Sequence, residues 1–327
     1  MNFNLDSLFR IIKKKEVPLD AETERGNPFI RTLKNIVIGE EDCGTFNGIM
    51  VQAIMKGGKI IKDFHDRIIH RFALEQVIDI LTEHKIVKSR QEITKEKLIA
   101  IISLGIEGIR IRSALTCESE EGICLKCYGS KNIVGNTVKF GEDVGLEAAY
   151  FWNEIAINEE IKQLLSPKSP EDSAILSEID GLVEMKSDKD NLKKIFVKSN
   201  TGLMREYCVP QGKVVLIRDR ESVIAGQQLT SGKISSQDIL RICGEKKLFD
   251  YLTQQILPCL SAANFDERLI EILLRQILKI EIEFPGDSTF SIGQIVNKAQ
   301  FISENASVMQ KNEQPAVGIP IFIGIEL

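Results

Sequence analysis

The chain has 327 residues, of which 43% are hydrophobic and 27% are charged, so it can bury one or more hydrophobic cores. No run of about 18 uncharged apolar residues occurs, which excludes a membrane-spanning helix. The N-terminal lysines follow the apolar residues, the reverse of a secretory signal, so we expect a cytoplasmic protein. The net charge of −5 argues against a free-standing nucleic-acid-binding protein but does not exclude a component of a larger assembly.

The first part of the chain predicts an arm and then a turn-rich region. Residues 1–42 indicate a short helix followed by a polar stretch, and residues 43–62 combine glycines with β-branched residues, which favours a strand pair. Two helices are predicted next, the second of which has Thr94 as its N-cap. The first has an apolar stripe that consists of Leu74, Val77, Ile78 and Leu81. Residues 108–139 then alternate short extended pieces with tight turns around the cysteines.

The second part predicts a helix, a break and a β-rich region. Residues 141–165 indicate a helix, and residues 166–170 form a serine- and proline-rich break that marks a domain boundary. Residues 174–230 predict short strands with glycine turns, followed by two amphipathic helices and a last β-rich stretch. The apolar side of the 141–165 helix consists of Val144, Ala148, Phe151, Trp152 and Ile155. The second amphipathic helix opens at Asp266, and its stripe consists of Ile270, Leu273, Leu274, Ile277 and Leu278. These elements predict an α+β fold with several domains.

Seven cysteines give the strongest chemical signal, because an odd number in a chain without an expected export signal favours metal ligation over disulfides. Cys124 and Cys127 are separated by two residues, so both sulfurs can ligate one ion from a tight turn, and Cys117 precedes them by seven positions. Gly122 and Gly129 permit the sharp backbone path on either side. The spacing predicts a zinc site with three thiolates. The alternative is that these are ordinary reduced cysteines in a core.

Tetrahedral zinc needs a fourth ligand, and the spacing alone leaves its identity open. Cys43, in the turn-like sequence Glu-Glu-Asp-Cys-Gly-Thr, is one candidate. The other candidates are His65, His70 and His84. Four thiolates on Zn²⁺ leave a formal charge of about −2, which we expect Arg112 and Lys126 to offset. The remaining cysteines have no partner at ligand spacing, and we predict that they are small apolar fillers: Cys208, Cys243 and Cys259.

Several motifs occur together in the order in which one protein family has them. In the first half they are Glu41-Asp42-Cys43-Gly44-Thr45 with Gly48-Ile49-Met50, Asp66 to Arg71, Arg112 to Cys117, Gly122 to Gly129 and Gly141 to Gly145. In the second half they are Ile175 to Val183, Val209 to Gly232, Glu271 to Ile277, Gly286 to Phe290 and Gly318 to Gly324. From residue 28 or so onward, the chain resembles the C-terminal region of the largest (β′) subunit of bacterial-type DNA-directed RNA polymerase.

The resemblance implies that Cys43 is the fourth ligand beside Cys117, Cys124 and Cys127, and that the chain binds one structural Zn²⁺. It implies the β subunit and the remaining β′ segments as partners, with template DNA reached through the assembly. It also implies four regions. Residues 1–42 are an N-terminal arm with a remnant of the bridge-helix end, and residues 43–140 are the four-cysteine zinc-binding region. Residues 141–165 are a helix that replaces the first trigger-loop helix, and residues 171–327 are a β-rich, sandwich-barrel-like region with two helices.

The sequence departs from the family where the family does its chemistry. After Ala148 and Ala149 the family continues into the trigger loop that closes over the nucleotide, whereas this chain continues with Tyr150 to Ile155 and has no histidine after His84. Only Phe29 to Asn35 resemble the end of the bridge helix, and the triple-aspartate motif that holds the catalytic Mg²⁺ has no counterpart. Because phosphoryl transfer depends on metal-held positioning, we expect no catalytic residue and no polymerase activity of the chain alone.

Three functions fit this pattern. The first, which we adopt, is a subunit segment that assembles with separately encoded β and β′ parts in a transcription complex. The second is a non-catalytic paralogue that binds polymerase or DNA as a regulator, and the third is a relic that folds without a function. The negative charge argues against strong DNA binding by the isolated chain, and the sequence indicates no particular nucleic-acid-binding residue.

Overall fold

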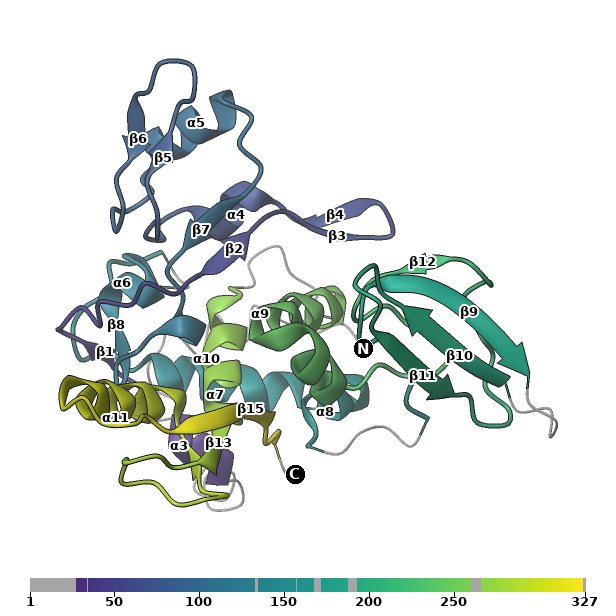
Figure 1. Ribbon diagram of the computed structural model, residues 1–327. Coiled ribbons are helices and arrows are strands. Elements are labelled where there is room, and N and C mark those ends of the chain that lie inside the picture. The colour runs from purple at the N-terminus through teal and green to yellow at the C-terminus, as the bar shows by residue number, and fades with distance from the viewer. Residues whose placement is uncertain are drawn as a thin grey trace. The chain divides into compact units, whose positions relative to one another are not determined.

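The computed structural model describes residues 28–33, 35–132, 135–156, 158–167, 172–187, 193–259 and 266–325. The short helix expected near the N-terminus lies outside these ranges, and so does part of the boundary expected at 166–170. The chain divides into two compact units, each built from separate stretches of sequence (Figure 1). The first unit combines Met1–Ile161 with Thr253–Ile319, and the second combines Lys162–Leu252 with Pro320–Glu326.

The first unit contains short strand pairs, two of which join distant parts of the chain. Strand β1 (Ile38–Gly39) pairs in parallel with β8 (Ile123–Cys124), and β2 (Ile49–Val51) pairs antiparallel with β7 (Ile109–Ile111). Strands β3 (Ile54–Lys56) and β4 (Lys59–Lys62) form a hairpin whose two turn glycines have positive φ. The strand pair predicted within residues 43–62 is therefore confirmed.

Between β4 and β7 the chain forms a short helix, a hairpin and a longer helix. These elements are α4 (Phe64–Ile68), β5 (Val77–Ile78), β6 (Lys85–Val87) and α5 (Lys95–Ser103). The second predicted helix is confirmed as α5, and Thr94 is its N-cap, although the Thr94 side chain makes no capping hydrogen bond. The first predicted helix, with its stripe over residues 74–81, is wrong, because β5 pairs with β6 instead.

A turn at Asp79 explains why no helix forms there. The Asp79 carboxylate accepts hydrogen bonds from the Leu81 N–H at 2.9 Å and from the Thr82 hydroxyl at 2.6 Å. Such local bonds from an aspartate close a turn and compete with helical hydrogen bonds. The turn leaves Leu81 92% exposed, so the four apolar residues do not share one buried face. A short apolar run fits a strand as well as a helix, and here the turn decides in favour of the strand.

The helix predicted for residues 141–165 forms as two helices, α7 (Val144–Ile155) and α8 (Glu159–Leu165). The Asp143 carboxylate caps α7 by accepting a hydrogen bond from the Leu146 N–H at 2.8 Å. The predicted apolar side of α7 is buried, with at most 1% of each residue exposed: Val144, Ala148, Phe151, Trp152 and Ile155.

Helix α7 packs closely against α3 (Pro28–Leu33). The rings of Trp152 and Phe29 meet edge-on with their centroids 6.0 Å apart. A Cβ atom at Gly145 would lie only 1.6 Å from the carbonyl oxygen of Leu33, so this approach of the two backbones requires a glycine. The packing fixes α7 against the start of the described chain.

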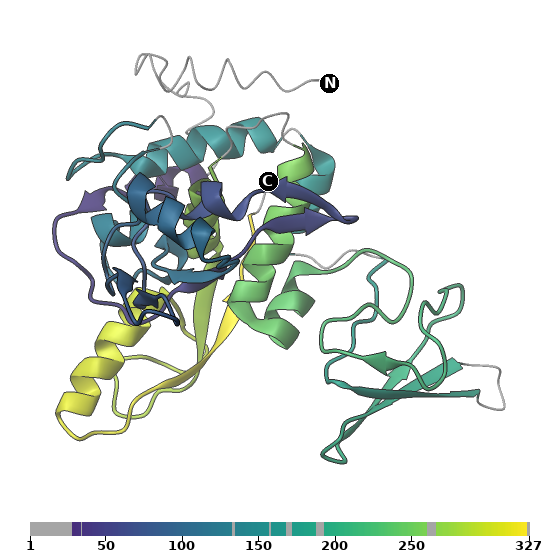
Figure 2. The ribbon, with the colours of Figure 1, turned by 90° about the horizontal axis from the view of Figure 1, so that it is seen from above.

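Helix α10 (Arg268–Ile277) runs directly into a three-stranded sheet with the strand order β14 (Ile295–Val296), β13 (Leu278–Phe284), β15 (Val317–Phe322). Figure 2 shows β13 and β15 side by side. All five residues of the predicted stripe are buried. Four of them, Ile270, Leu273, Leu274 and Ile277, lie in α10, and the fifth, Leu278, is the first residue of β13. Helix α11 (Lys298–Gln310), which was not predicted, packs Phe301 against the core of the sheet.

The short strands predicted for residues 174–230 are confirmed, and in the second unit they form a four-stranded antiparallel sheet. Its order is β11 (Met204–Cys208), β10 (Lys193–Lys198), β9 (Gly181–Ser187), β12 (Ser222–Val223). Its core consists of Val183, Ile195, Val197, Val209, Ile217, Val223 and Leu229. Helix α9 (Ser236–Ile256) follows and bends at Gly244, whose φ is +80°.

Small sheets and helices alternate in both units, so the predicted α+β class is confirmed. Among the described strands, the sheet of the second unit stays open and no sheet closes into a barrel. Within the part of the chain that the structure describes, no helix combines the length and the apolar character needed to cross a lipid bilayer.

Candidate metal centre

Four cysteine side chains from three parts of the first unit meet at one point. Cys43 lies in the loop after β1, Cys117 ends the 3₁₀ helix η1 (Ala114–Thr116), Cys124 ends β8, and Cys127 lies in α6 (Leu125–Tyr128). Their Sγ atoms all lie within 4.8 Å of one another. Cys117, Cys124 and Cys127 are buried, and Cys43 is half-buried. The structure thus brings together the four residues that the resemblance implies as ligands.

The three histidines that the spacing left open as a fourth ligand lie outside this group. The His65 ring contacts Asp63 at 2.7 Å, and the His70 ring contacts Glu92 at 3.1 Å. Cys43 therefore completes the group among the described residues.

The local backbone of the centre depends on glycine where the sequence predicted it. Gly122 has a φ of +68°, and a Cβ atom there would lie 2.2 Å from the Val37 carbonyl oxygen. Gly129, just after α6, has a φ of +116°. The pairing of β1 with β8 places the segment before Cys43 beside Cys124, and the Cys124 N–H donates to the Cys117 sulfur at 3.4 Å. These contacts hold the ligand loops in place through the backbone.

The spacing of the sulfurs fits a tetrahedral metal ion. With Zn–S bonds of about 2.3 Å, tetrahedral geometry separates the sulfurs by about 3.8 Å. The Cys43 sulfur lies 3.6 Å from that of Cys124 and 3.7 Å from that of Cys127. Four thiolates would fill the coordination sphere of such an ion and leave no position for a substrate, which is the pattern of structural rather than catalytic zinc sites. The donor set can hold a metal ion.

The clustered sulfurs also change one another's acidity. Hydrogen bonds from Cys117 and Cys127 lower the pKa of Cys124 to about 6, against the effect of Cys43 and of burial. Hydrogen bonds from Cys117, Cys124 and Cys127 lower the pKa of Cys43 well below its ordinary value. A hydrogen bond with Cys124 raises the pKa of Cys117, and one with Cys117 raises that of Cys127, so two of the four thiols are shifted toward the thiolate that metal ligation requires.

Arg112 supplies the positive charge that the thiolates need, as predicted. Its Nη2 atom donates to the sulfurs of Cys43 at 3.1 Å and of Cys124 and Cys127 at 3.3 Å each. Its Nη1 atom contacts the Asp42 carboxylate at 2.6 Å, and the side chain is fully buried. A buried guanidinium over three sulfurs neutralises thiolate charge directly.

The prediction that Lys126 offsets thiolate charge is wrong. Lys126 donates to the Asp42 carboxylate at 2.8 Å and not to a sulfur. Burial opposes ionisation of Asp42, but hydrogen bonds from Lys126, from the Gly44 N–H and from Arg112 lower its pKa to about 2. Lys126 pairs with Asp42 from a partly exposed position, so it supports the residue that holds Arg112.

Two of the remaining cysteines lie within the described side chains. Cys208 is exposed on β11, the edge strand of the second unit, so the prediction of an apolar filler is wrong for it. Cys243 is half-buried in α9. The side chain of Cys259 lies outside the described part.

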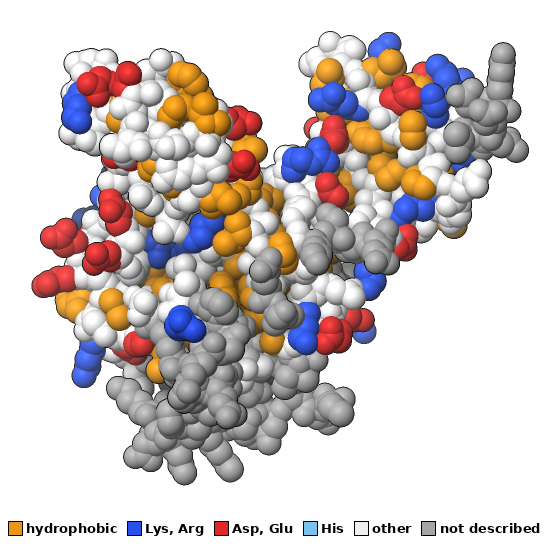
Figure 3. All heavy atoms as spheres, turned by 90° about the horizontal axis from the view of Figure 1, so that it is seen from below, with side chains coloured by type: hydrophobic (Ala, Val, Ile, Leu, Met, Phe, Trp, Pro, Cys, Tyr) orange, Lys and Arg blue, Asp and Glu red, His pale blue; other side chains and the backbone are white. Residues whose placement is uncertain are grey.

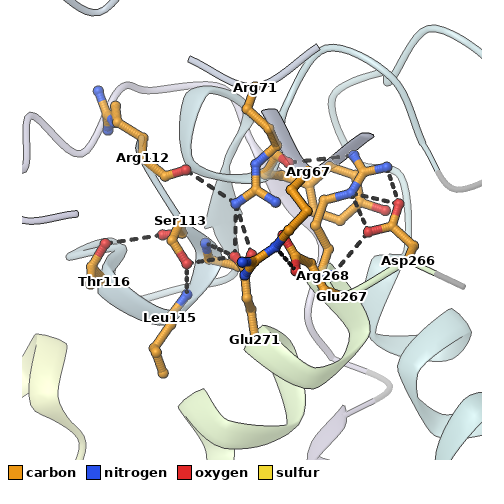
Figure 4. A network of polar contacts seen from close by, with 12 residues as sticks. Arg67, Arg71, Arg112, Ser113, Leu115, Thr116, Asp266, Glu267, Arg268 and Glu271 are labelled. Carbon is orange, nitrogen blue, oxygen red and sulfur yellow. Dashed lines mark hydrogen bonds and ion pairs between the residues drawn. The ribbon is translucent and has the colours of Figure 1, made fainter. Parts of the chain in front are cut away.

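A buried network of charged residues links the centre to α10, and the sequence reasoning missed it (Figure 4). Arg67 pairs with Glu267 at 2.7 Å, and Arg71 pairs with Glu271 at 2.8 Å. All four residues are at most 4% exposed. The available signal was the spacing of the two glutamates, which lie four residues apart at the N-cap and in the first turn of α10 and so share one side of the helix.

A further acid, the half-buried Glu147, lies on α7 and interacts with Arg268 and Asp266 of the network. The Tyr128 hydroxyl donates to its carboxylate at 3.3 Å, and the Arg268 guanidinium lies 4.7 Å from the centre of the Tyr128 ring. Burial raises the pKa of Glu147 to about 7; Glu142 and Asp266 add to the rise, and Arg268 opposes it.

Glu147 is expected to make the stability of the fold depend on pH. Its pKa is about 7 in the folded chain against an ordinary 4.5, so the folded state retains a proton that the unfolded state loses. The free energy of unfolding should therefore fall as the pH rises from about 4.5 to about 7 and then stay level. Glu147→Gln should remove this part of the fall. Denaturant unfolding at several pH values measures it, and Glu283→Gln, at an exposed position of β13, is the control. A wild-type-to-variant difference that stays constant over this pH range would contradict the assignment.

No family model matches the chain. It is 34% identical over 315 residues to the DNA-directed RNA polymerase subunit β′ of Caldicellulosiruptor saccharolyticus, which covers 89% of this chain and 27% of that protein. The β′ subunits of Acetivibrio thermocellus and Caldanaerobacter subterraneus are 32% and 31% identical, with 89% of this chain covered in each case.

The chain is therefore a homologue of RNA polymerase β′ subunits, and it matches their C-terminal part. It spans about a quarter of the length of the curated relatives that it matches. The resemblance seen in the sequence motifs is confirmed.

Proposed function

We propose that the chain is a β′-type subunit segment that contributes a zinc-stabilised, non-catalytic part to a cytoplasmic transcription complex. The observation that carries the proposal is the convergence of four cysteine sulfurs within 4.8 Å in a chain homologous to β′ over 89% of its length. The proposed partners are the β subunit and the remaining β′ segments, with template DNA reached through them.

In this proposal Cys43, Cys117, Cys124 and Cys127 hold one Zn²⁺. Bound zinc supplies a cross-link between Cys43 and the segment that begins at Cys117, 74 positions later in the sequence. The residues of the chain do the rest: Arg112 offsets the thiolate charge, and Asp42 orients Arg112. No position of this centre is open to a substrate, so its role is to hold the fold.

The absence of catalysis by the chain itself is proposed from its sequence and from α7. Where the family has the mobile trigger loop, this chain has Tyr150 to Ile155, and Phe151 and Trp152 are each 1% exposed. A loop that opens and closes in each cycle needs a marginally stable hinge, whereas two large buried aromatic side chains favour one fixed position. We propose that α7 and α8 replace the first trigger-loop helix with a static packing element.

Exposed apolar side chains support the proposal that the chain assembles with partners. On the second unit they include Leu182, Met204 and Ile224, which are 52%, 56% and 65% exposed. On the first unit Ile80 and Leu81 are each 92% exposed. Figure 3 shows hydrophobic side chains among acidic and basic ones on one face of the surface. Exposed apolar groups of this kind gain free energy when a partner covers them.

Reconstitution tests the proposal. The purified chain alone should incorporate no nucleotide on a primed template with Mg²⁺. Mixed with the β subunit and a truncated β′ subunit that lacks the homologous C-terminal part, it should co-elute with them as one complex. Synthesis by the rigorously pure chain would refute the non-catalytic assignment. Stable binding to a polymerase that already contains complete β′ would instead favour the regulatory paralogue, and no binding to either would refute assembly.

A further inference from the structure

Three charged residues of α10 face the metal-binding region from successive turns. Glu267, Glu271 and Arg275 are spaced by four residues, so they lie on one side of the helix. Glu267 contacts Arg67, which lies between Cys43 and Cys117 in the sequence and outside the segment next to Cys117. The other two residues contact the backbone on either side of Cys117.

Glu271 holds the segment just before Cys117. Its carboxylate accepts hydrogen bonds from the Ser113 hydroxyl at 2.5 Å and from the Ala114 N–H at 2.8 Å. It also accepts from Arg71, whose Nη2 atom donates in turn to the carbonyl oxygen of Arg112 at 3.1 Å. Figure 4 shows Arg71 and Ser113 pointing toward Glu271. The same carboxylate therefore fixes the start of η1 and, through Arg71, the backbone of the residue that covers the sulfurs.

Arg275 holds the segment just after Cys117. Its Nη2 atom donates to the carbonyl oxygen of Ser119 at 2.5 Å, and its Nη1 atom donates to that of Gly122 at 2.6 Å. These two carbonyl groups lie in the loop that joins Cys117 to Cys124. One guanidinium thus closes the loop between two ligands, while Glu271 anchors the loop's entry one helical turn away.

We infer that α10 positions Cys117 for metal binding, with Glu271 and Arg275 as its positioning residues. The inference rests on the proposed binding of zinc by the four cysteines. Release of a tetrahedral ion begins with the departure of one ligand, and a ligand loop held at both ends departs less often. The segments on both sides of Cys117 are held by α10, which lies about 150 positions later in the sequence. The helix therefore controls how long the ion is retained.

Arg275→Met is the first test, because it removes both donors but keeps an apolar stem, and the two freed carbonyl groups lie in a partly exposed loop. The full chain is loaded with Zn²⁺ alone, and its transfer to an excess of chromophoric chelator is timed. We expect transfer to be about 10-fold faster than in the wild type, as is typical when a residue that supports a metal ligand is lost. Glu271→Gln should act in the same direction. The absorption spectrum of the Co²⁺-loaded variants should shift as well, which reports the ligand geometry directly.

Glu267→Gln is the matched control, since it breaks the neighbouring buried ion pair on the same helix without touching the Cys117 segment. It should lower thermal stability but leave zinc transfer within about 2-fold of the wild type, at a temperature where all variants keep their near-UV spectrum. Equal acceleration by Arg275→Met and Glu267→Gln, or acceleration by neither, overturns the inference. A wild-type chain that binds no zinc refutes the proposed function instead, so the two failures are distinguishable.

Discussion

Protein purified without chelator is expected to contain about one zinc ion per chain, and Cys124→Ser is expected to lose it together with the folded state of residues 43–140. The Cys124 sulfur is buried and lies 3.6 Å from that of Cys43. Structural zinc contributes folding free energy on the order of 10 kcal/mol, which is comparable to the whole stability of a domain. Elemental analysis gives the zinc content, and near-UV circular dichroism with limited proteolysis gives the folded state.

Cys208→Ser is the matched control, because Cys208 is exposed on the edge strand of the other unit. Its zinc content and near-UV spectrum should equal those of the wild type. Metal-free wild-type protein with an unchanged near-UV spectrum and thermal stability would show that the four thiols do not bind a structural ion.

Trp152→Ala is expected to destabilise the first unit by about 3–5 kcal/mol, the range measured for large aromatic residues removed from a core. Trp152 is 1% exposed and meets the ring of Phe29 edge-on, so its loss leaves a cavity between α7 and α3. Denaturant unfolding followed by circular dichroism measures the change. Leu81→Ala, at a position that is 92% exposed, should change the free energy of unfolding by less than about 0.5 kcal/mol.

The same residue reports whether α7 is static. Trp152 is the only tryptophan, so the fluorescence of the chain comes from this site alone. In the isolated chain we expect blue-shifted emission that resists aqueous quenchers. Emission typical of water that shifts to the blue only when polymerase subunits are added would contradict static packing and indicate an interface at α7.

The sequence predicted most of the metal centre because its signals are local. Two cysteines in a Cys-x-x-Cys turn with flanking glycines need only a few residues to define their geometry, and Gly122 and Gly129 have the positive φ values that such turns require. Cys43 was different. From spacing alone, Cys43 and three histidines were all candidates for the fourth ligand, because no local pattern links Cys43 to Cys117, 74 positions later in the sequence. The β1–β8 pairing closes that distance, and only the tertiary structure contains it.

Patterns over whole helices were also predictable where one face meets a core. The stripes of α7 and α10 are buried because apolar side chains at helical spacing gain free energy only when they share one covered face. The stripe at residues 74–81 had similar spacing but failed. There the Asp79 side chain closes a turn, and a run of this length does not distinguish a strand from a helix.

The sequence predicted both Arg112 and Lys126 as counter-charges of the thiolates, and the tertiary structure decided between them. Lys126 is adjacent to a ligand in sequence, yet it pairs with Asp42, while Arg112 reaches three sulfurs from the end of β7. The contacts of Glu271 and Arg275 with the Cys117 segment join residues about 150 positions apart, and a sequence pattern contains no information on such a distance. The sequence by itself predicted the group formed by Cys117, Cys124 and Cys127 and the buried faces of α7 and α10, because both follow from spacing along one segment. Which cation neutralises the thiolates, and which helix holds their loop, depend on how separate segments pack.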